Sequence, residues 1–226
     1  MVAFPLCETT LVLYASQIAL SSSYANVKLH LAAVKHYAIA HGYKVGRYDR
    51  LYLVLRGIRK SQGRSYNKPK RIPVTPNLLR KIKSNLFASN YAYGDKCMLW
   101  SAMTIAFFGL LRASEYTCQF VNRYNPETDL CVSDVTGTSV GVAVRIKASK
   151  TDIFREGVMI RIAPNATEIC PISALTNYLR TRNWKSGPLF VFQNGQFLRR
   201  ADISRCLKMF SGTSENISSH SFLLSI

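Results

Sequence analysis

The stretch "AFFGLLRASEY" at 106–116 joins an apolar segment to two charged residues, Arg112 and Glu115. It ends the apolar run 97–111, which is too short to cross a bilayer, since a spanning helix needs roughly 20 residues. We therefore expect a buried core helix over 96–109 and a new helix starting at "RASEY". Charged groups avoid such surroundings unless they are paired or needed for chemistry. Arg112 and Glu115 are consequently the first candidates for a functional site.

The residues after this stretch predict a mixture of strands and helices. Apolar residues alternate with polar ones in 140–149 and again in 157–164. This period of two is typical of half-buried strands, so the two segments predict an antiparallel hairpin across "KTDIFRE". The other elements expected in this half are helices at 170–183 and 199–210 and a strand at 188–198 that contains an Asn-Gly turn.

Amphipathic patterns before the stretch predict four short helices in a bundle over 1–85. Thr75 followed by Pro76 is a strong start signal for the last of them. Together with the second half, this predicts a mainly α protein with a small antiparallel β-sheet (α+β), divided into domains 1–85 and 86–226. The four helices are expected at 8–19, 21–42, 49–61 and 75–86.

The charge distribution predicts a polyanionic partner. The formal net charge is +18 at pH 7, and residues 1–94 hold 15 basic and 2 acidic residues (15 − 2 = +13). Nucleic acid is the commonest partner for such a surface, and an acidic protein or a membrane surface is the competing interpretation. One basic run has no acidic residue within it and is expected to contact DNA phosphates unless it is only a solvated linker. It comprises Arg56, Arg59, Lys60, Arg64, Lys68, Lys70 and Arg71.

Cysteine and histidine spacing argues against a disulfide framework and against a metal site. The six cysteines include no Cys-x-x-Cys pair, and the four histidines include no pair four residues apart. The N-terminus lacks the basic segment of a signal peptide. We therefore expect reduced cysteines, no metal, no cofactor and no membrane insertion, in an intracellular and nuclear protein.

Arg112, Lys150 and His220 are the basic residues that could serve a phosphoryl transfer on DNA. A guanidinium grips two phosphate oxygens, an ammonium protonates a leaving oxygen, and an imidazole assists nearby. Glu115 lies three residues after Arg112 along a helix and could hold the guanidinium in place. Spacing alone leaves simpler interpretations open: a helix-start ion pair for Arg112, a solvated turn for Lys150, and a capping or surface histidine at His220.

The order of segments resembles the tyrosine recombinase (phage-integrase-like) family, in the versions carried by eukaryotic mobile elements such as Cryptons and retrotransposons. The resemblance rests on "AFFGLLRASEY", "IKASKTDIFREG", "CPISALTNYLRTR" and "SSHSF" in this order, over nearly the whole chain. It implies that a helical core-binding domain and a catalytic domain together clamp double-stranded DNA. It further implies that Arg112 is the first catalytic arginine, Glu115 its acidic support, Lys150 the hairpin lysine and His220 the histidine of an H-x-x-R motif.

Two departures from the family pattern predict an inactive enzyme. Leu223 stands at the arginine position of H-x-x-R, and none of the twelve tyrosines lies after His220. Losing one charged clamp costs about 3–4 kcal/mol by analogy with an oxyanion donor, and losing the nucleophile abolishes covalent catalysis. We therefore expect a C-terminally truncated recombinase that binds DNA without breaking it. The rivals are a non-catalytic partner-binding or structural module whose basic face meets an acidic protein or a membrane surface, and a chain that folds poorly.

Overall fold

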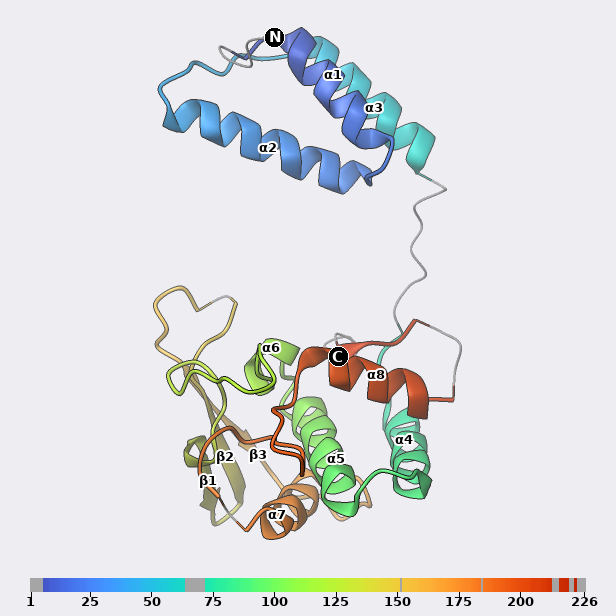
Figure 1. Cartoon of the computed structure of the whole chain (residues 1–226), viewed down its shortest axis with the longest axis vertical. Helices are drawn as coiled ribbons and strands as arrows, with labels where there is room; N and C mark the ends of the chain where they lie inside the picture. Colours follow the sequence, from blue (N-terminus) through green and yellow to red (C-terminus); the bar gives the residue numbers. More distant parts are fainter. Residues whose placement is uncertain are drawn as a thin grey trace. The chain divides into compact units, whose positions relative to one another are not determined.

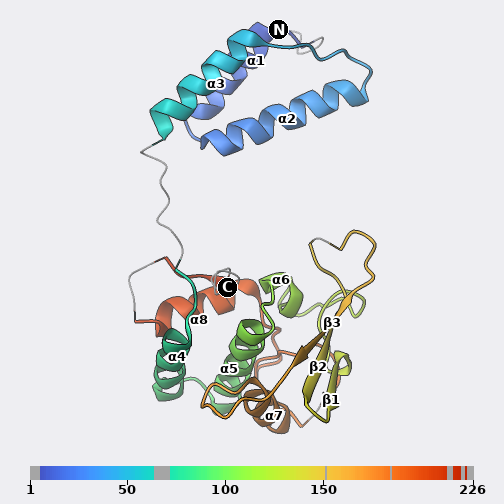
Figure 2. The same ribbon diagram turned by 180° about the vertical axis from the view of Figure 1, so that it is seen from behind.

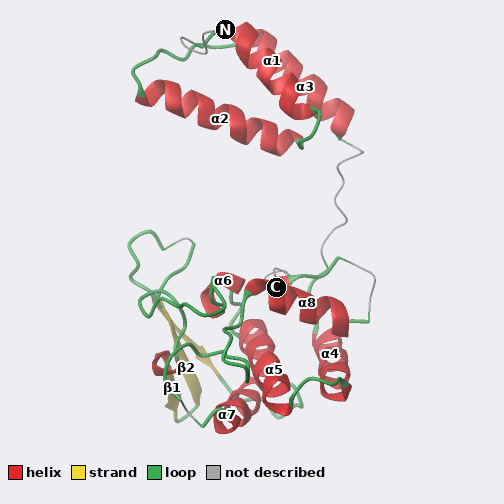
Figure 3. Ribbon diagram, in the orientation of Figure 1, coloured by secondary structure: helices red, strands yellow, loops and turns green. Residues whose placement is uncertain are grey.

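The chain folds as two compact units, one within Met1–Pro69 and one within Lys70–Ile226. Helices occur in both units, and the described strands lie in the second, as the yellow arrows of Figure 3 show. The prediction of a mainly α protein with a small antiparallel sheet is therefore confirmed. The structure is a computed structural model that describes residues 6–63, 72–150, 152–183, 185–212, 216–219 and 222.

The first unit consists of three helices, α1 (Glu8–Ala19), α2 (Tyr24–Ala40) and α3 (Asp49–Gln62) (Figure 1). Each presents an apolar stripe to the other two, as the helical spacing predicts. The core between them is small, so much of each helix remains exposed. The buried residues of this core are Leu11, Ala15, Val27, Leu31 and Leu51.

Two side chains attach the ends of α3 to the other helices. The Oε1 atom of Glu8 accepts hydrogen bonds from the backbone N–H groups of Arg50 and Leu51 at 2.6 and 3.1 Å. These donors have no partner within the first turn of α3, so Glu8 caps that helix from α1. At the other end, Gln62 donates to two carbonyl oxygens in the turn between α1 and α2 and at the end of α1.

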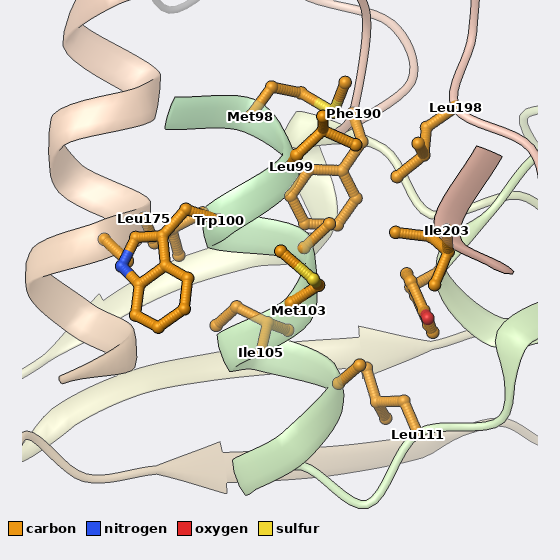
Figure 4. Close-up of a cluster of buried hydrophobic side chains, with 14 of the residues drawn as sticks. Met98, Leu99, Trp100, Met103, Ile105, Leu111, Leu175, Phe190, Leu198 and Ile203 are labelled. Atoms are coloured by element: carbon orange, nitrogen blue, oxygen red, sulfur yellow. The ribbon is translucent and has the colours of Figure 1, made fainter. Parts of the chain in front are cut away.

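The second unit is built around α5, most of whose residues are buried. Helix α5 packs against α7, α4 and α8. Figure 4 shows Met98, Met103 and Ile105 of α5 among side chains from other elements of the same core, which include Leu175 and Ile203. The helices of this unit are α4 (Pro76–Ala88), α5 (Tyr93–Phe108), α6 (Ala113–Tyr116), the 3₁₀ helix η1 (Val132–Asp134), α7 (Pro171–Thr181) and α8 (Arg200–Phe210).

Helix α4 belongs to this second unit, whereas the sequence analysis placed it in the bundle over 1–85. Thr75 caps its N-terminus as predicted, because its hydroxyl accepts a backbone hydrogen bond at 3.2 Å. Its buried side chains, Leu79, Ile82 and Leu86, join the core formed by α5 and α8. The amphipathic pattern predicted the helix and not its neighbours, because an apolar stripe does not specify which element covers it.

Three strands form an antiparallel sheet in the order β1 (Val135–Thr138), β2 (Gly141–Ile146) and β3 (Val158–Ile162). Strands β2 and β3 confirm the predicted hairpin and pair with Val144 opposite Ile160. The short strand β1 was not predicted.

The prediction of a strand at 188–198 is wrong. This segment makes isolated bridges, one of them between Val191 and Phe197. The phenolic oxygen of Tyr178 donates to the Leu189 carbonyl at 3.0 Å and accepts from the Val191 N–H at 2.9 Å, so a side chain takes the place of a neighbouring strand. The predicted Asn-Gly turn is present, with Gly195 at a φ of +84°.

Candidate functional site

The chain turns sharply between α5 and Arg112. Leu110 adopts a left-handed conformation with a φ of 51°. The backbone N–H of Gly109 makes the last helical bond of α5 at 2.8 Å, and that of Leu111 donates to the Ala106 carbonyl at 3.0 Å, which is the 6→1 bond of a Schellman motif. A left-handed residue other than glycine costs roughly 1–2 kcal/mol. The turn buries Leu111 in the core and places Arg112 at the start of α6.

Arg112, Glu115 and Ser149 form a closed set of hydrogen bonds. The Nη1 atom of Arg112 donates to Glu115 Oε1 at 3.1 Å and to Ser149 Oγ at 2.8 Å. The Ser149 hydroxyl donates in turn to Glu115 Oε1 at 2.7 Å. The other carboxylate oxygen of Glu115 accepts the backbone N–H of Arg112 at 2.7 Å. The carboxylate therefore fixes both the side chain and the backbone of Arg112.

The guanidinium of Arg112 faces a cavity of about 440 Å³. Its side chain is 40% exposed, whereas that of Glu115 is only 7% exposed. The Nε and Nη2 atoms of Arg112 donate to no described residue, so two positions of the planar donor set remain for a ligand. Asp152 and Glu156 also line this cavity, and the Asp152 carboxylate is engaged by the backbone N–H groups of Glu156 and Gly157.

The two lysines of the hairpin have different surroundings. Lys147 forms an ion pair with Asp134, with Nζ 2.6 Å from Oδ2, and the two side chains are 13% and 9% exposed. Its ammonium also donates to a backbone carbonyl at 2.7 Å, so both of these interactions of Lys147 are with the protein itself and stabilise the fold. Lys150 directly follows Ser149, is exposed, and makes no hydrogen bond or ion pair with a described residue. Lys150 is thus next to the site in sequence but does not contact Arg112.

Several of the predicted site residues lie outside the described part of the chain. These include His220, although its neighbours Ser219 and Phe222 are fully buried in the second unit. The backbone N–H of Ser219 donates to the Ser204 hydroxyl of α8 at 3.2 Å. The predicted DNA-contacting residues that also fall outside are Arg64, Lys68, Lys70 and Arg71.

The described part of the basic run lies on one face of α3. Arg56, Arg59 and Lys60 are exposed and border a hollow of about 520 Å³, with Arg59 and Lys60 three and four residues after Arg56. The Arg59 guanidinium lies 6.0 Å from the ring centroid of Tyr24. These three residues form no ion pair with a described residue. The structure therefore gathers three of the seven predicted basic residues on one surface of the first unit.

Ser149 is the residue of this site that the sequence analysis missed. It lies in "IKASKTD", a segment already central to the resemblance. A hydroxyl group immediately before the hairpin lysine was the available signal. Its role depends on contact with Arg112, 37 residues earlier, and no local pattern encodes such a contact.

Two tyrosines of the second unit are buried. Tyr116 follows Glu115, and burial raises the pKa of its hydroxyl group. Burial is also the main cause that raises the pKa of Tyr178. A buried phenol that resists ionisation cannot reach a phosphate in the cavity, so neither tyrosine is placed to act as a nucleophile.

Among the described residues, no three His, Cys, Asp or Glu side chains are grouped to hold a metal ion. In the same part of the chain, no helix combines the length and the apolar character needed to cross a membrane.

No protein-family profile matches the sequence, and no curated protein is significantly similar to it. Solved structures do resemble the fold. A lambda integrase dimer bound to a COC' core site superposes with a TM-score of 0.61 at 17% identity, covering 98% of this chain and 69% of that one. The XerH site-specific recombinase bound to a difH substrate superposes with a TM-score of 0.59 at 17% identity, covering 97% of this chain and 58% of that one.

A third similar structure is the Tn1549 transposon integrase in complex with transposon right end DNA. It superposes with a TM-score of 0.55 at 14% identity, covering 99% of this chain and 72% of that one. This chain thus spans between about three fifths and three quarters of these proteins as crystallised. At these identities the likeness concerns the fold alone, which this chain shares with these integrase and recombinase structures.

Proposed function

We propose that this chain binds duplex DNA as a protein of the recombinase type, and that Arg112 contacts a backbone phosphate. The observation that carries the proposal is the fixed guanidinium, held on one edge by Glu115 and Ser149 and open on the other to a cavity. Such a planar donor set matches two phosphate oxygens. The fold supports it, because the similar lambda integrase, XerH and Tn1549 integrase structures contain DNA.

The basic face of α3 supplies the second contact in this proposal. Arg56, Arg59 and Lys60 are exposed and without acidic partners among the described residues, so their charge is available to phosphates. The predicted continuation through Arg64, Lys68, Lys70 and Arg71 would extend the same contact along the backbone of the duplex. Contacts of this kind give affinity and position, and they carry no sequence information.

We further infer that these 226 residues do not break or rejoin DNA. Leu223 occupies the position where the resemblance expects the second arginine, and a leucine has no group to donate to phosphate oxygens. The burial of Tyr116 and Tyr178 supports the inference, because neither hydroxyl is available to attack a phosphate in the cavity. Phosphate binding at Arg112 requires neither a second arginine nor a nucleophilic tyrosine.

Titration of a labelled duplex at several salt concentrations tests the binding proposal. We expect measurable affinity at low salt and a linear fall of log K with log salt. The variant R56A/R59A/K60A should flatten the slope by about 2.7, because each lost phosphate contact removes about 0.9. The control K44A/R47A removes two exposed charges from the loop before α3 and should change the slope less. No binding at low salt, or affinity independent of salt, would end the proposal.

A nicked suicide duplex tests the inference of inactivity. Denaturing gel electrophoresis should show no covalent adduct between protein and DNA, even at protein concentrations that saturate binding. An adduct that disappears on replacing one tyrosine by phenylalanine would identify a nucleophile and refute the inference.

A second candidate function is a partner-binding module, favoured by an apolar groove between α1 and α2. Leu6, Leu11, Tyr14, Val34 and Tyr37 line this groove, whose volume is about 440 Å³. Charge reversal at four basic residues separates the two functions. If it leaves DNA binding unchanged and abolishes binding to a protein partner, the second function is correct. The residues to reverse are Arg59, Lys60, Lys68 and Lys70.

A further inference from the structure

The loop between β2 and β3 presents two large apolar side chains to solvent. Ile153 is 85% exposed and Phe154 is 84% exposed, the highest values among the large hydrophobic residues of the described chain. Single exposed apolar residues are ordinary on a protein surface, but two adjacent ones at the end of a loop indicate an interaction site. Figure 2 shows this loop extending beyond the ends of β2 and β3.

Hydrogen bonds give the loop a defined shape. The Asp152 carboxylate accepts the backbone N–H groups of Glu156 at 3.1 Å and of Gly157 at 2.8 Å, closing a turn around the two apolar residues. Arg155 and Gly157 adopt left-handed φ values of 55° and 72°. A Cβ atom on Gly157 would lie 2.8 Å from a backbone oxygen of β2. The loop therefore holds its exposed pair at the apex without relying on contacts made by the pair itself.

The surroundings of the pair identify the chemistry of its partner. Lys150 and Arg155 flank it, and both are exposed. The turn also holds two acids: Asp152, whose carboxylate accepts backbone hydrogen bonds of the loop, and the exposed Glu156. The same loop lines the cavity that holds the Arg112 guanidinium. A ligand that reaches both the Arg112 guanidinium and the exposed pair would combine an anionic group with an apolar face, as the phosphates and bases of DNA do.

We propose that Ile153 and Phe154 insert between or against bases of the bound duplex, beside the phosphate at Arg112. The proposal rests on the proposed DNA-binding function. Asp152 lines the cavity and Phe154 is two residues further on, a span of at most about 7 Å. Base pairs are spaced about 3.4 Å apart along the helix, so Phe154 lies within about two base steps of the cavity wall formed by Asp152. Apolar wedges of this kind unstack a base step and bend the duplex.

Binding of a 30-base-pair duplex with 2-aminopurine at its TpA steps tests the proposal. Anisotropy reports affinity, and 2-aminopurine fluorescence rises when a base loses its stacking. The wild-type chain should bind and raise the fluorescence. I153S/F154S should abolish the rise and weaken binding on the order of 10-fold, while the salt slope stays unchanged because no charge is removed. F154W together with native Ile153 should keep the rise.

The matched control is V140S, which removes an exposed apolar side chain from the turn between β1 and β2. It should behave as the wild type in both measurements, and circular dichroism should show all variants folded. If the wild type binds DNA and I153S/F154S binds equally with the same fluorescence, the wedge is wrong and DNA binding stands. If the wild type does not bind, the proposed function itself fails. A change of oligomeric state in I153S/F154S with unchanged fluorescence would assign the pair to a contact between copies and overturn the wedge.

Discussion

The two units of the molecule differ in how many of their basic residues form ion pairs. Residues 6–63 hold 8 basic and 2 acidic residues (8 − 2 = +6). One of the acids, Glu8, caps α3, and the other, Asp49, forms the only ion pair described in this unit, with Arg47. The second unit pairs five of its described basic residues with acids of the same unit. These pairs are Arg80 with Glu168, Arg112 with Glu115, Lys147 with Asp134, and Arg199 and Arg205 with Asp202.

This difference separates charges that build the fold from charges that remain for a ligand. A paired and buried charge cannot be withdrawn without cost, because its partner is left desolvated. An exposed charge without a partner contributes little to stability and is free to neutralise a phosphate. Under the proposed function, the first unit therefore offers exposed charge to DNA from a small core, and the second holds the half-exposed Arg112 against Glu115 and Ser149.

Removing one partner of an ion pair in each unit should give the largest contrast. Asp134→Ala leaves Lys147 unpaired and nearly buried, and should destabilise the second unit by about 3–5 kcal/mol. Asp49→Ala breaks the exposed pair with Arg47 and should cost less than about 1 kcal/mol. Both tryptophans lie after residue 94, so tryptophan fluorescence in urea follows the second unit, and far-ultraviolet circular dichroism follows both. Equal losses would contradict the distinction.

Serine substitutions should give an intermediate contrast. Ser149→Ala removes a hydroxyl that bonds both Arg112 and Glu115, and should lower the free energy of unfolding by about 1–3 kcal/mol. Ser61→Ala, on the exposed end of α3, should have almost no effect. Urea titration followed by fluorescence for the first variant and circular dichroism for the second measures both. Rescue by Ser149→Thr would show that the hydroxyl, and not the side-chain volume, is responsible.

Leucine-to-glycine substitutions should give the smallest effects, but with opposite signs. Leu110→Gly relieves a left-handed φ and should stabilise the second unit by less than about 1 kcal/mol, because glycine also loosens the unfolded chain. Leu53→Gly lies within α3 and should destabilise the first unit by about 1 kcal/mol. Thermal unfolding of both variants tests the signs. A destabilised L110G protein would mean that the leucine side chain contributes more than the strained backbone costs.

Most helices and the hairpin could be predicted from the sequence, because the patterns that indicate them are local. Thr75 before Pro76 and the alternation around β2 each depend on neighbouring residues alone. The pairing of Arg112 with Glu115 was also within reach, since three residues separate them. The predicted strand at 188–198 is wrong because the structure of this segment depends on a contact with a residue outside it. The Tyr178 hydroxyl forms hydrogen bonds with the backbone of Leu189 and Val191 that a neighbouring strand would otherwise form. No periodicity in that segment indicates this contact.

The capping of α3 by Glu8 has a consequence for how the first unit assembles. The carboxylate reaches across 42 residues of chain, and Gln62 reaches back across 43 and 40. Helix α3 therefore gains its terminal bonds only after α1 has docked, so the unit forms through non-local closure and at a correspondingly slower rate. A version of the chain that starts at α2 would carry every basic side chain of α3 and yet lack the scaffold that orders them.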